Sequence, residues 1–164
     1  RFYMSDTLSP EPTSKKQLKE VLNWGSVKWS NMNRMFYGCN NLNIDHSIKP
    51  PDLSQVTDMS YMFYGCSSLN GPLNIDNWDV SNVTDMSSIF LGASYFNQPI
   101  GNWDVSNITD MSNMFSSARR FEQPIDQWNT SNVNNMSAMF SGVSSFNQPI
   151  GNWDVSNVND MSNM

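Results

Sequence analysis

The chain has 164 residues, of which 38% are hydrophobic, 12% aromatic and only 15% charged. This hydrophobic content can form a core, which argues against a disordered chain, and no apolar run approaches the roughly 20 residues of a membrane span. Residues 1–49 carry seven Lys/Arg against four acids, net +3, whereas residues 50–164 carry two arginines against eleven acids, net −9. Because an acidic body without lysine repels phosphates, nucleic acid is not an expected partner.

Residues 1–28 are predicted to cap one end of a repeat array. Residues 1–4 are expected to end a strand, and residues 5–13, with two prolines, to form a loop. A capping box begins at Ser14, and apolar residues at helical spacing follow it, which predicts a helix over about 15–23. Repeat arrays need such a cap because it covers the open end of their core.

Residues 29–164 consist of about six copies of one motif. The motif Asn-Trp-Asp-Val-Ser-Asn-Ile-Thr-Asp-Met-Ser, which begins at Asn102, recurs with a step of 25 residues, and two earlier copies fit with a step of 27. The sixth copy stops at Met164 before its expected Phe, and the chain starts without Met, so we expect a fragment of a longer array. A period of 20–30 residues is typical of solenoids, in which each copy is one coil.

Each coil is predicted to contain a short helix and a short strand. Apolar residues after each Asp-Met-Ser have helical spacing, which indicates one to two turns of α- or 3₁₀-helix. The stretch Phe96–Ile100 alternates like a strand, and Pro99 shortens that strand because proline lacks a ladder donor. The predicted fold class is therefore an α/β repeat, a leucine-rich-repeat-like solenoid with short strands, short helices and an N-terminal helical cap.

The repeat also resembles a known family. Asn-Trp-Asp-Val-Ser-Asn-Val-Thr-Asp-Met-Ser-x-Met-Phe, followed by Ala and Phe-Asn-Gln-Pro-Ile, is similar to the repeat of BspA-type leucine-rich-repeat surface proteins, also called the mycoplasma lipoprotein-associated repeat domain. The resemblance covers roughly residues 24–164. It implies a leucine-rich-repeat-like solenoid on bacterial surfaces, linked to adhesion. Thr130 and the pair Arg119-Arg120 depart from the usual pattern.

No arrangement of residues indicates an enzyme or a cofactor. His46 is the only histidine and lies in an irregular insertion, without a nucleophile and an orienting acid in an evident grouping. No Gly-rich phosphate loop is present, and no Cys or His has metal-ligand spacing. We therefore expect neither catalysis nor a bound cofactor.

Acidic residues recur at fixed positions, and their role has two interpretations. They are expected to accept N–H groups of their own turn or short helix, which agrees with the replacement by Asn129 and Asn135 in two copies. The alternative is a calcium ion between stacked carboxylates, because hard cations prefer oxygen ligands. The column in question contains Asp58, Asp85, Asp110 and Asp160.

Other invariant columns are assigned to the fold. The column of Asn82 and Asn107 is expected to bond backbone groups of the neighbouring coil. The column of Trp78 and Trp103 is expected to form a packed ladder, with a sugar-stacking strip as the alternative. Cys39 and Cys66 share one repeat position, so they are either small buried residues or partners in a disulfide.

Positions that vary between copies can carry recognition, because the fold does not need one residue there. The variable positions lie on and after the predicted short helix and contain Tyr and Arg, the residue types enriched at binding hot spots. The candidate binding residues are Tyr37, Tyr61, Tyr64, Leu91, Tyr95, Arg119 and Arg120, with Arg34 beside them. The competing interpretation is that they are scattered surface residues.

Two classes of function remain open. The first is an extracellular or cell-surface binding module that adheres to a protein or glycan on another cell or matrix through a solenoid face. The second is a structural spacer that presents another domain and has no ligand of its own. The sequence identifies no particular ligand.

Overall fold

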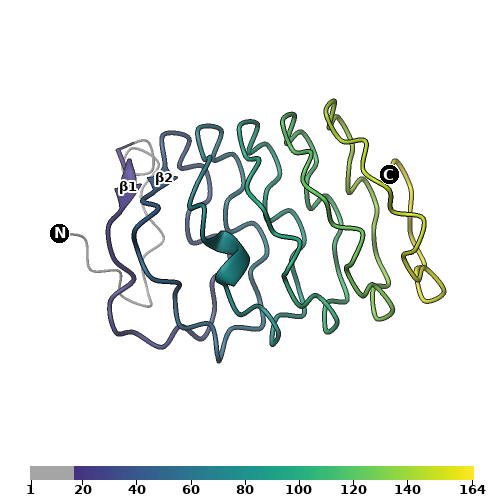
Figure 1. The fold of residues 1–164 in the computed structure, drawn as a ribbon, viewed down its shortest axis with the longest axis horizontal. Coiled ribbons are helices and arrows are strands. Elements are labelled where there is room, and N and C mark those ends of the chain that lie inside the picture. The colour runs from purple at the N-terminus through teal and green to yellow at the C-terminus, as the bar shows by residue number, and fades with distance from the viewer. Residues whose placement is uncertain (1–16) are drawn as a thin grey trace.

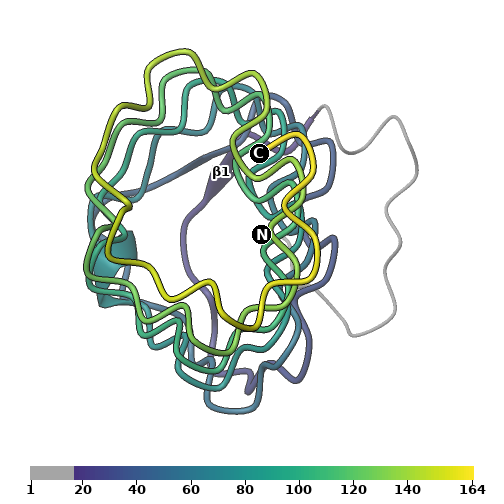
Figure 2. The same ribbon diagram turned by 90° about the vertical axis from the view of Figure 1, so that its right-hand side faces the viewer.

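The computed structural model describes residues 17–164 as a row of stacked coils (Figure 1). The chain advances by one coil per repeat, and a view along the stack shows the coils superposed around a common interior (Figure 2). Regular secondary structure is scarce among these residues: the strands β1 (Glu20–Val21) and β2 (Asn43–Ile44) and the 3₁₀-helix η1 (Ile75–Asn77). The rest of the described residues form turns and irregular segments.

The predicted fold class is wrong. An α/β leucine-rich-repeat-like solenoid has a strand and a helix in each coil, and within residues 17–164 only one two-stranded parallel sheet and one three-residue helix occur. The segments after each Asp-Met-Ser form consecutive turns instead of short helices, and the stretch Phe96–Ile100 has no strand. Neighbouring coils are linked through single parallel bridges, such as that between Asp58 and Asp85.

Alternating backbone hydrogen bonds explain why turns replace helices. In the second coil, every other N–H donates to a carbonyl of the third coil at 2.7–3.0 Å, namely those of Met59, Tyr61, Phe63 and Gly65. The N–H groups in between donate three residues back within the coil, as Met62 does to Met59 at 3.2 Å. An α-helix would keep all these donors inside one segment, so the stack could not use them. We call this part of each coil the turn ladder; in the second coil it spans residues 58–66.

The turn ladder contains a left-handed residue at one fixed position in each coil. Its φ lies between 52° and 58°, at Arg34, Tyr61, Ser88, Asn113, Ala138 and Asn163. Four residues further on, φ is positive again, at Gly38, Gly65, Gly92, Ser117 and Gly142. An α-helix requires right-handed dihedrals throughout, so these positions end any helix after a single turn.

The predicted N-terminal helix over 15–23 is also wrong where the structure describes it. Residues 17–23 contain no helix, and Glu20–Val21 forms β1, which pairs in parallel with β2. Val21 is buried whereas Leu22 is 69% exposed, so the apolar residues alternate as in a strand rather than share a helix face. The predicted strand end at 1–4 and loop at 5–13 lie outside the described residues.

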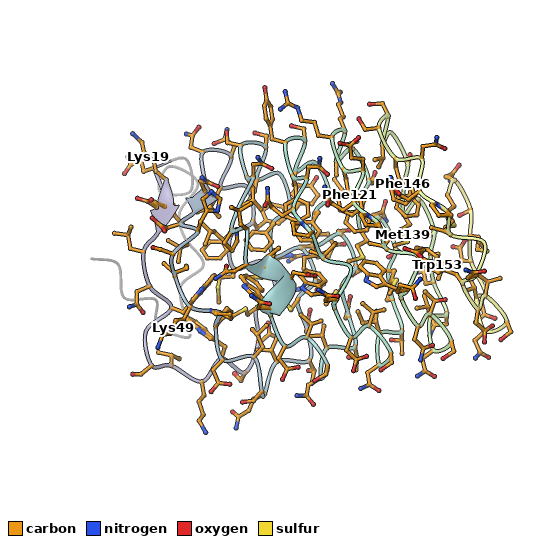
Figure 3. All side chains as sticks on the ribbon, viewed as in Figure 1. Lys19, Lys49, Phe121, Met139, Phe146 and Trp153 are labelled. Atoms are coloured by element: carbon orange, nitrogen blue, oxygen red, sulfur yellow. The ribbon has the colours of Figure 1, made fainter. Side chains whose placement is uncertain are left out.

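Stacked aromatic columns form the core. Phe63 lies 5.6 Å from Phe36 and 5.7 Å from Phe90 between ring centroids, with planes within 10° of parallel. A second column of Phe96, Phe121 and Phe146 packs against the first, with Phe115 and Phe121 4.0 Å apart. Figure 3 shows the labelled Phe121, Met139, Phe146 and Trp153 among the coils and Lys19 and Lys49 toward the first coils. Equivalent residues therefore stack upon one another, as expected.

The repeated tryptophans are packed core residues. Trp78, Trp103, Trp128 and Trp153 are at most 7% exposed. The indole N–H of Trp103 donates to the carbonyl of Ile75 in the preceding coil at 2.8 Å, and Trp128 and Trp153 do the same to Ile100 and Ile125 at 3.1 Å. Buried rings cannot stack on a sugar, so the packed ladder is confirmed and the sugar-stacking alternative is wrong.

Candidate functional site

The first two coils bring four candidate residues into one cluster. Arg34 and Tyr37 come from the first coil, and Tyr61 and Tyr64 come from the equivalent positions of the second coil. The rings of Tyr37 and Tyr64 stack face to face at 4.5 Å with a 5° angle between their planes, and Tyr61 lies about 6 Å from both. The guanidinium carbon of Arg34 lies 5.0 Å from the centre of the Tyr61 ring and 6.0 Å from that of Tyr37. These four residues are called the tyrosine cluster below.

The turn ladder determines how the tyrosine cluster is held. Met59, Met62, Phe63 and Cys66 are buried, whereas Tyr61 and Tyr64, which lie between them in sequence, are half-buried at the surface. The backbone at Arg34 and Tyr61 is left-handed, with φ of 56° and 58°. Their N–H groups donate to Ser60 and Ser87 of the next coils at 3.0 Å. The cluster therefore stands on a backbone that neighbouring coils hold in place.

Leu91 continues the row that Tyr37 and Tyr64 begin. It occupies the equivalent position in the third coil, where its carbonyl accepts a hydrogen bond from Gly65 N–H at 2.7 Å. Leu91 is half-buried, like the two tyrosines. This row is thus only partly exposed, and the rings of Tyr37 and Tyr64 cover each other.

The remaining three candidates form a separate turn in the third and fourth coils. Tyr95 is 50% exposed, and the guanidinium carbon of Arg120 lies 4.0 Å from the centre of its ring. The two residues occupy the same repeat position, because Phe96 and Phe121 directly after them stack on each other. Arg119 is exposed beside them, and its carbonyl accepts a hydrogen bond from the Ser144 hydroxyl at 3.3 Å. Tyr95, Arg119 and Arg120 are called the arginine turn below.

The acidic columns accept N–H groups of their own turns, as predicted. Asp58 Oδ1 accepts Ser60 N–H at 2.8 Å, and Asp110 Oδ1 accepts Ser112 N–H at 2.7 Å. Asn135 does the same for Ser137 at 3.0 Å and also donates to Asp110 at 3.3 Å. Asp85 and Asp160 follow the same pattern with Ser87 and Ser162. Within residues 17–164, no three His, Cys, Asp or Glu side chains lie close enough together to hold a metal ion.

Other polar side chains also form hydrogen bonds between coils, and no such role was predicted for Asn97 or His46. Asn97 binds the backbone N–H of Glu122 at 3.1 Å and the amide of Gln123 at 2.9 Å, both in the next coil. His46 is exposed, and its Nδ1 accepts Leu73 N–H at 3.0 Å. Asn107 donates to the Ser81 carbonyl of the preceding coil at 2.8 Å, which confirms the role predicted for its column. The signal in the sequence for the hydrogen bonds of Asn97, Gln123 and Asn107 is that Asn and Gln recur at fixed repeat positions.

The two cysteines are buried in the turn ladder and carry reduced thiols. Cys66 donates from Sγ to the carbonyl of Phe36 in the first coil at 3.1 Å. Burial raises the pKa of the Cys66 thiol, so the thiolate is disfavoured. The interpretation as small buried residues fits this environment, and the alternative disulfide is not formed in this structure.

One family model matches the chain twice, over residues 7–103 and 72–164, and is described as a Mycoplasma protein of unknown function, DUF285. The chain belongs to this family. The two overlapping matches agree with the internal repetition, and neither is to a leucine-rich-repeat or BspA model. Comparisons with curated proteins and with solved structures gave no significant match.

Proposed function

We propose that this DUF285 chain is a binding module of the cell surface or extracellular space, which adheres to a protein through the tyrosine cluster. The observation that carries the proposal is the gathering of three tyrosines and one arginine at outward positions that the other coils fill with Ser, Asn, Ala or Leu. The coil does not need aromatic residues there, because the fourth and fifth coils repeat the same backbone without them.

The physical properties of the cluster suit an anchor for a protein partner. Its rings pack against one another before any partner arrives, and tyrosine loses little side-chain entropy on binding. Tyr and Arg are also the residue types in which binding energy concentrates at interfaces. The facing sides of Tyr37 and Tyr64 cover each other, which leaves less ring surface for a sugar than an open platform offers.

The cellular location rests on the resemblance to BspA-type surface proteins, which links such repeats to adhesion. Among the residues that the structure describes, no helix is long and apolar enough to cross a bilayer. A long array of similar coils also suits a surface protein, because several weak contacts along one face add up to strong attachment.

A variant that borrows residues from the third coil tests the proposal. Leu91 and Ser88 occupy the positions of Tyr64 and Tyr61 there, so Tyr37→Leu, Tyr61→Ser and Tyr64→Leu together retain side chains that this backbone accepts. We expect at least a tenfold loss of binding of labelled protein to matrix proteins or cells, because truncation of several hot-spot residues typically costs 2 kcal/mol or more. The melting temperature should change by only a few degrees.

The control replaces equivalent outward residues of later coils, Asn113, Ser116 and Ser141, by Ala and should bind like the unmodified chain. Equal binding by the tyrosine variant would place the recognition surface elsewhere, with the Asn-Gln-Pro-Ile side of the coils as the next candidate. Absence of binding by the unmodified chain to matrix proteins, glycans and cells would favour the spacer function instead.

A further inference from the structure

The arginine turn presents two positive charges in residues 50–164, whose other charged residues are all acidic. Arg119 and Arg120 are the only Lys or Arg among residues 50–164, which contain eleven Asp and Glu. Both side chains are exposed. The equivalent positions in the next coil hold the uncharged residues Ser144 and Ser145.

No carboxylate of this chain neutralises these guanidinium groups within the described residues 17–164. Arg120 stacks on Tyr95 at 4.0 Å, and the contact of Arg119 is through its backbone carbonyl. The nearest acid in sequence, Glu122, instead accepts a hydrogen bond from the Asn97 side chain at 3.3 Å. Asp104 and Asp110, two acids earlier in the same coil, accept the N–H groups of Ser106 and Ser112 in their own turns.

Stacking on Tyr95 prepares Arg120 for a directional contact. A guanidinium over a ring face can still donate from its N–H groups, and a carboxylate can accept two parallel hydrogen bonds from them. The same arrangement occurs in the tyrosine cluster, where Arg34 lies over the Tyr61 ring of the next coil. Both arginines therefore share an aromatic support from a neighbouring coil.

We propose that the arginine turn binds an Asp or Glu carboxylate of the protein partner and thereby provides a second contact in addition to the tyrosine cluster. This inference rests on the proposed function and adds the chemistry of the partner. The charges favour an isolated carboxylate on a protein over a polyanion, because a sulfated glycan or a nucleic acid would meet the net −9 of the surrounding body. An isolated carboxylate can contact Arg119 and Arg120 without lying close to the acidic turns.

Nuclear magnetic resonance can test the contact directly, since the chain has a mass of only 18.7 kDa. The probe is a capped peptide Gly-Ser-Glu-Glu-Ser-Gly, and the matched control replaces both Glu by Gln. We expect saturable shifts of the backbone signals of Tyr95, Arg119 and Arg120 and of the arginine Nε–H groups with the Glu peptide only. The dissociation constant of such an exposed contact should be about 1–10 mM.

Three variants sharpen the test. Arg119→Gln with Arg120→Gln should weaken the peptide at least fivefold, and Arg120→Lys should lose most of that affinity because a lysine lacks the planar fork. Lys49→Gln is the control: it removes an exposed positive charge from residues 1–49 and should leave the affinity for the Glu peptide within twofold.

The inference is overturned if the Gln peptide causes the same shifts, if the double variant binds like the unmodified chain, or if a sulfated disaccharide binds more tightly than the Glu peptide. Its failure is separable from failure of the proposed function, because the tyrosine variant leaves the arginine turn intact. If adhesion depends on the tyrosines but the Glu peptide does not bind the arginine turn, this inference is refuted and the proposed function is not.

Discussion

One backbone position in each coil is left-handed whatever residue type occupies it. The left-handed position of the turn ladder holds Arg34 and Tyr61 as well as Asn113 and Ala138, with nearly the same φ. For residues other than Gly and Asn this conformation costs roughly 1–2 kcal/mol. A hydrogen bond between coils offsets this cost, because the N–H of the left-handed residue donates to a carbonyl of the neighbouring coil. Tyr61, for example, donates to the Ser87 carbonyl at 3.0 Å.

Ser117 provides a measurable case. Its φ is 60°, and the equivalent residue is glycine in the coils on either side. We expect Ser117→Gly to raise the free energy of unfolding by about 0.5–1 kcal/mol, because relief of the left-handed strain exceeds the added entropy of the unfolded chain. Scanning calorimetry should show a melting temperature about 1–3 °C higher. Ser116→Gly is the control and should lower it; a lower value for Ser117→Gly would contradict the strain argument.

At the scale of elements, turns stand where helices are predicted, and the predicted strand at Phe96–Ile100 is irregular backbone. Apolar residues spaced by three and four lie on one side of an α-helix, but they also point inward from consecutive turns that bond three residues back. In the Asp-x-Ser turns, the Asp side chain accepts hydrogen bonds from the Ser two residues later. These turns are therefore stable without a helix or strand. Asp104, for example, accepts both the N–H of Ser106 at 3.1 Å and its hydroxyl at 2.6 Å.

These turns predict how stability depends on pH. The side-chain hydrogen bond from Ser106 and then its backbone N–H lower the pKa of Asp104, and Ser156 lowers the pKa of Asp154 in the same way. A carboxyl with a lowered folded-state pKa stabilises the protein above its unfolded pKa of about 3.9, and this contribution is lost as the pH falls through the folded value. The melting temperature should therefore drop below about pH 4.

Replacing both residues, Asp104→Asn and Asp154→Asn, should flatten that drop. Asn129 occupies the same position in the intervening coil and accepts Ser131 N–H at 3.2 Å, so an uncharged acceptor also completes the turn. Asp126→Asn is the control, since the Asp126 carboxylate contacts the side chain of Gln127. Melting curves from pH 7 to pH 2 decide the matter, and an equal drop in the double variant would refute the prediction.

At the scale of the whole molecule, each coil depends on its neighbours. The aromatic columns run from Phe36 to Phe140 without interruption, and each coil donates backbone hydrogen bonds to the next. Stability in such arrays is a sum over coils and the interfaces between them, so a defect inside one coil weakens two interfaces.

Met111→Asp should therefore unfold the stack. Met111 is fully buried, and its N–H donates to Asn135 of the next coil at 2.9 Å. A buried carboxylate without a partner costs several kcal/mol, which is comparable with the stability of a domain of this size. Circular dichroism should show loss of a cooperative transition. Asn113→Asp, at an outward position whose left-handed backbone Asp tolerates, should melt like the parent; a folded Met111→Asp protein would contradict the proposed core.

The period, the buried columns and the turn-capping acids could all be predicted from the amino-acid sequence, because these features depend on residue identity at a fixed spacing. The candidate binding residues could be named in the same way, since Tyr and Arg interrupt otherwise small polar columns. That Tyr37, Tyr61 and Tyr64 form one cluster with Arg34, while Tyr95 stacks with Arg120 apart from them, depends on which coil lies beside which.

The choice between helix and turn was decided only by the tertiary structure. The N–H of Phe63 has an acceptor within its own segment if the segment is a helix, and an acceptor at Ile89 if another coil lies alongside. Local spacing is compatible with both, and only the neighbouring coil offers the second set of carbonyls. Once the coils stack, alternate donors bond across the stack, left-handed residues become tolerable, and the fold consists of turns where the residue pattern alone predicts helices.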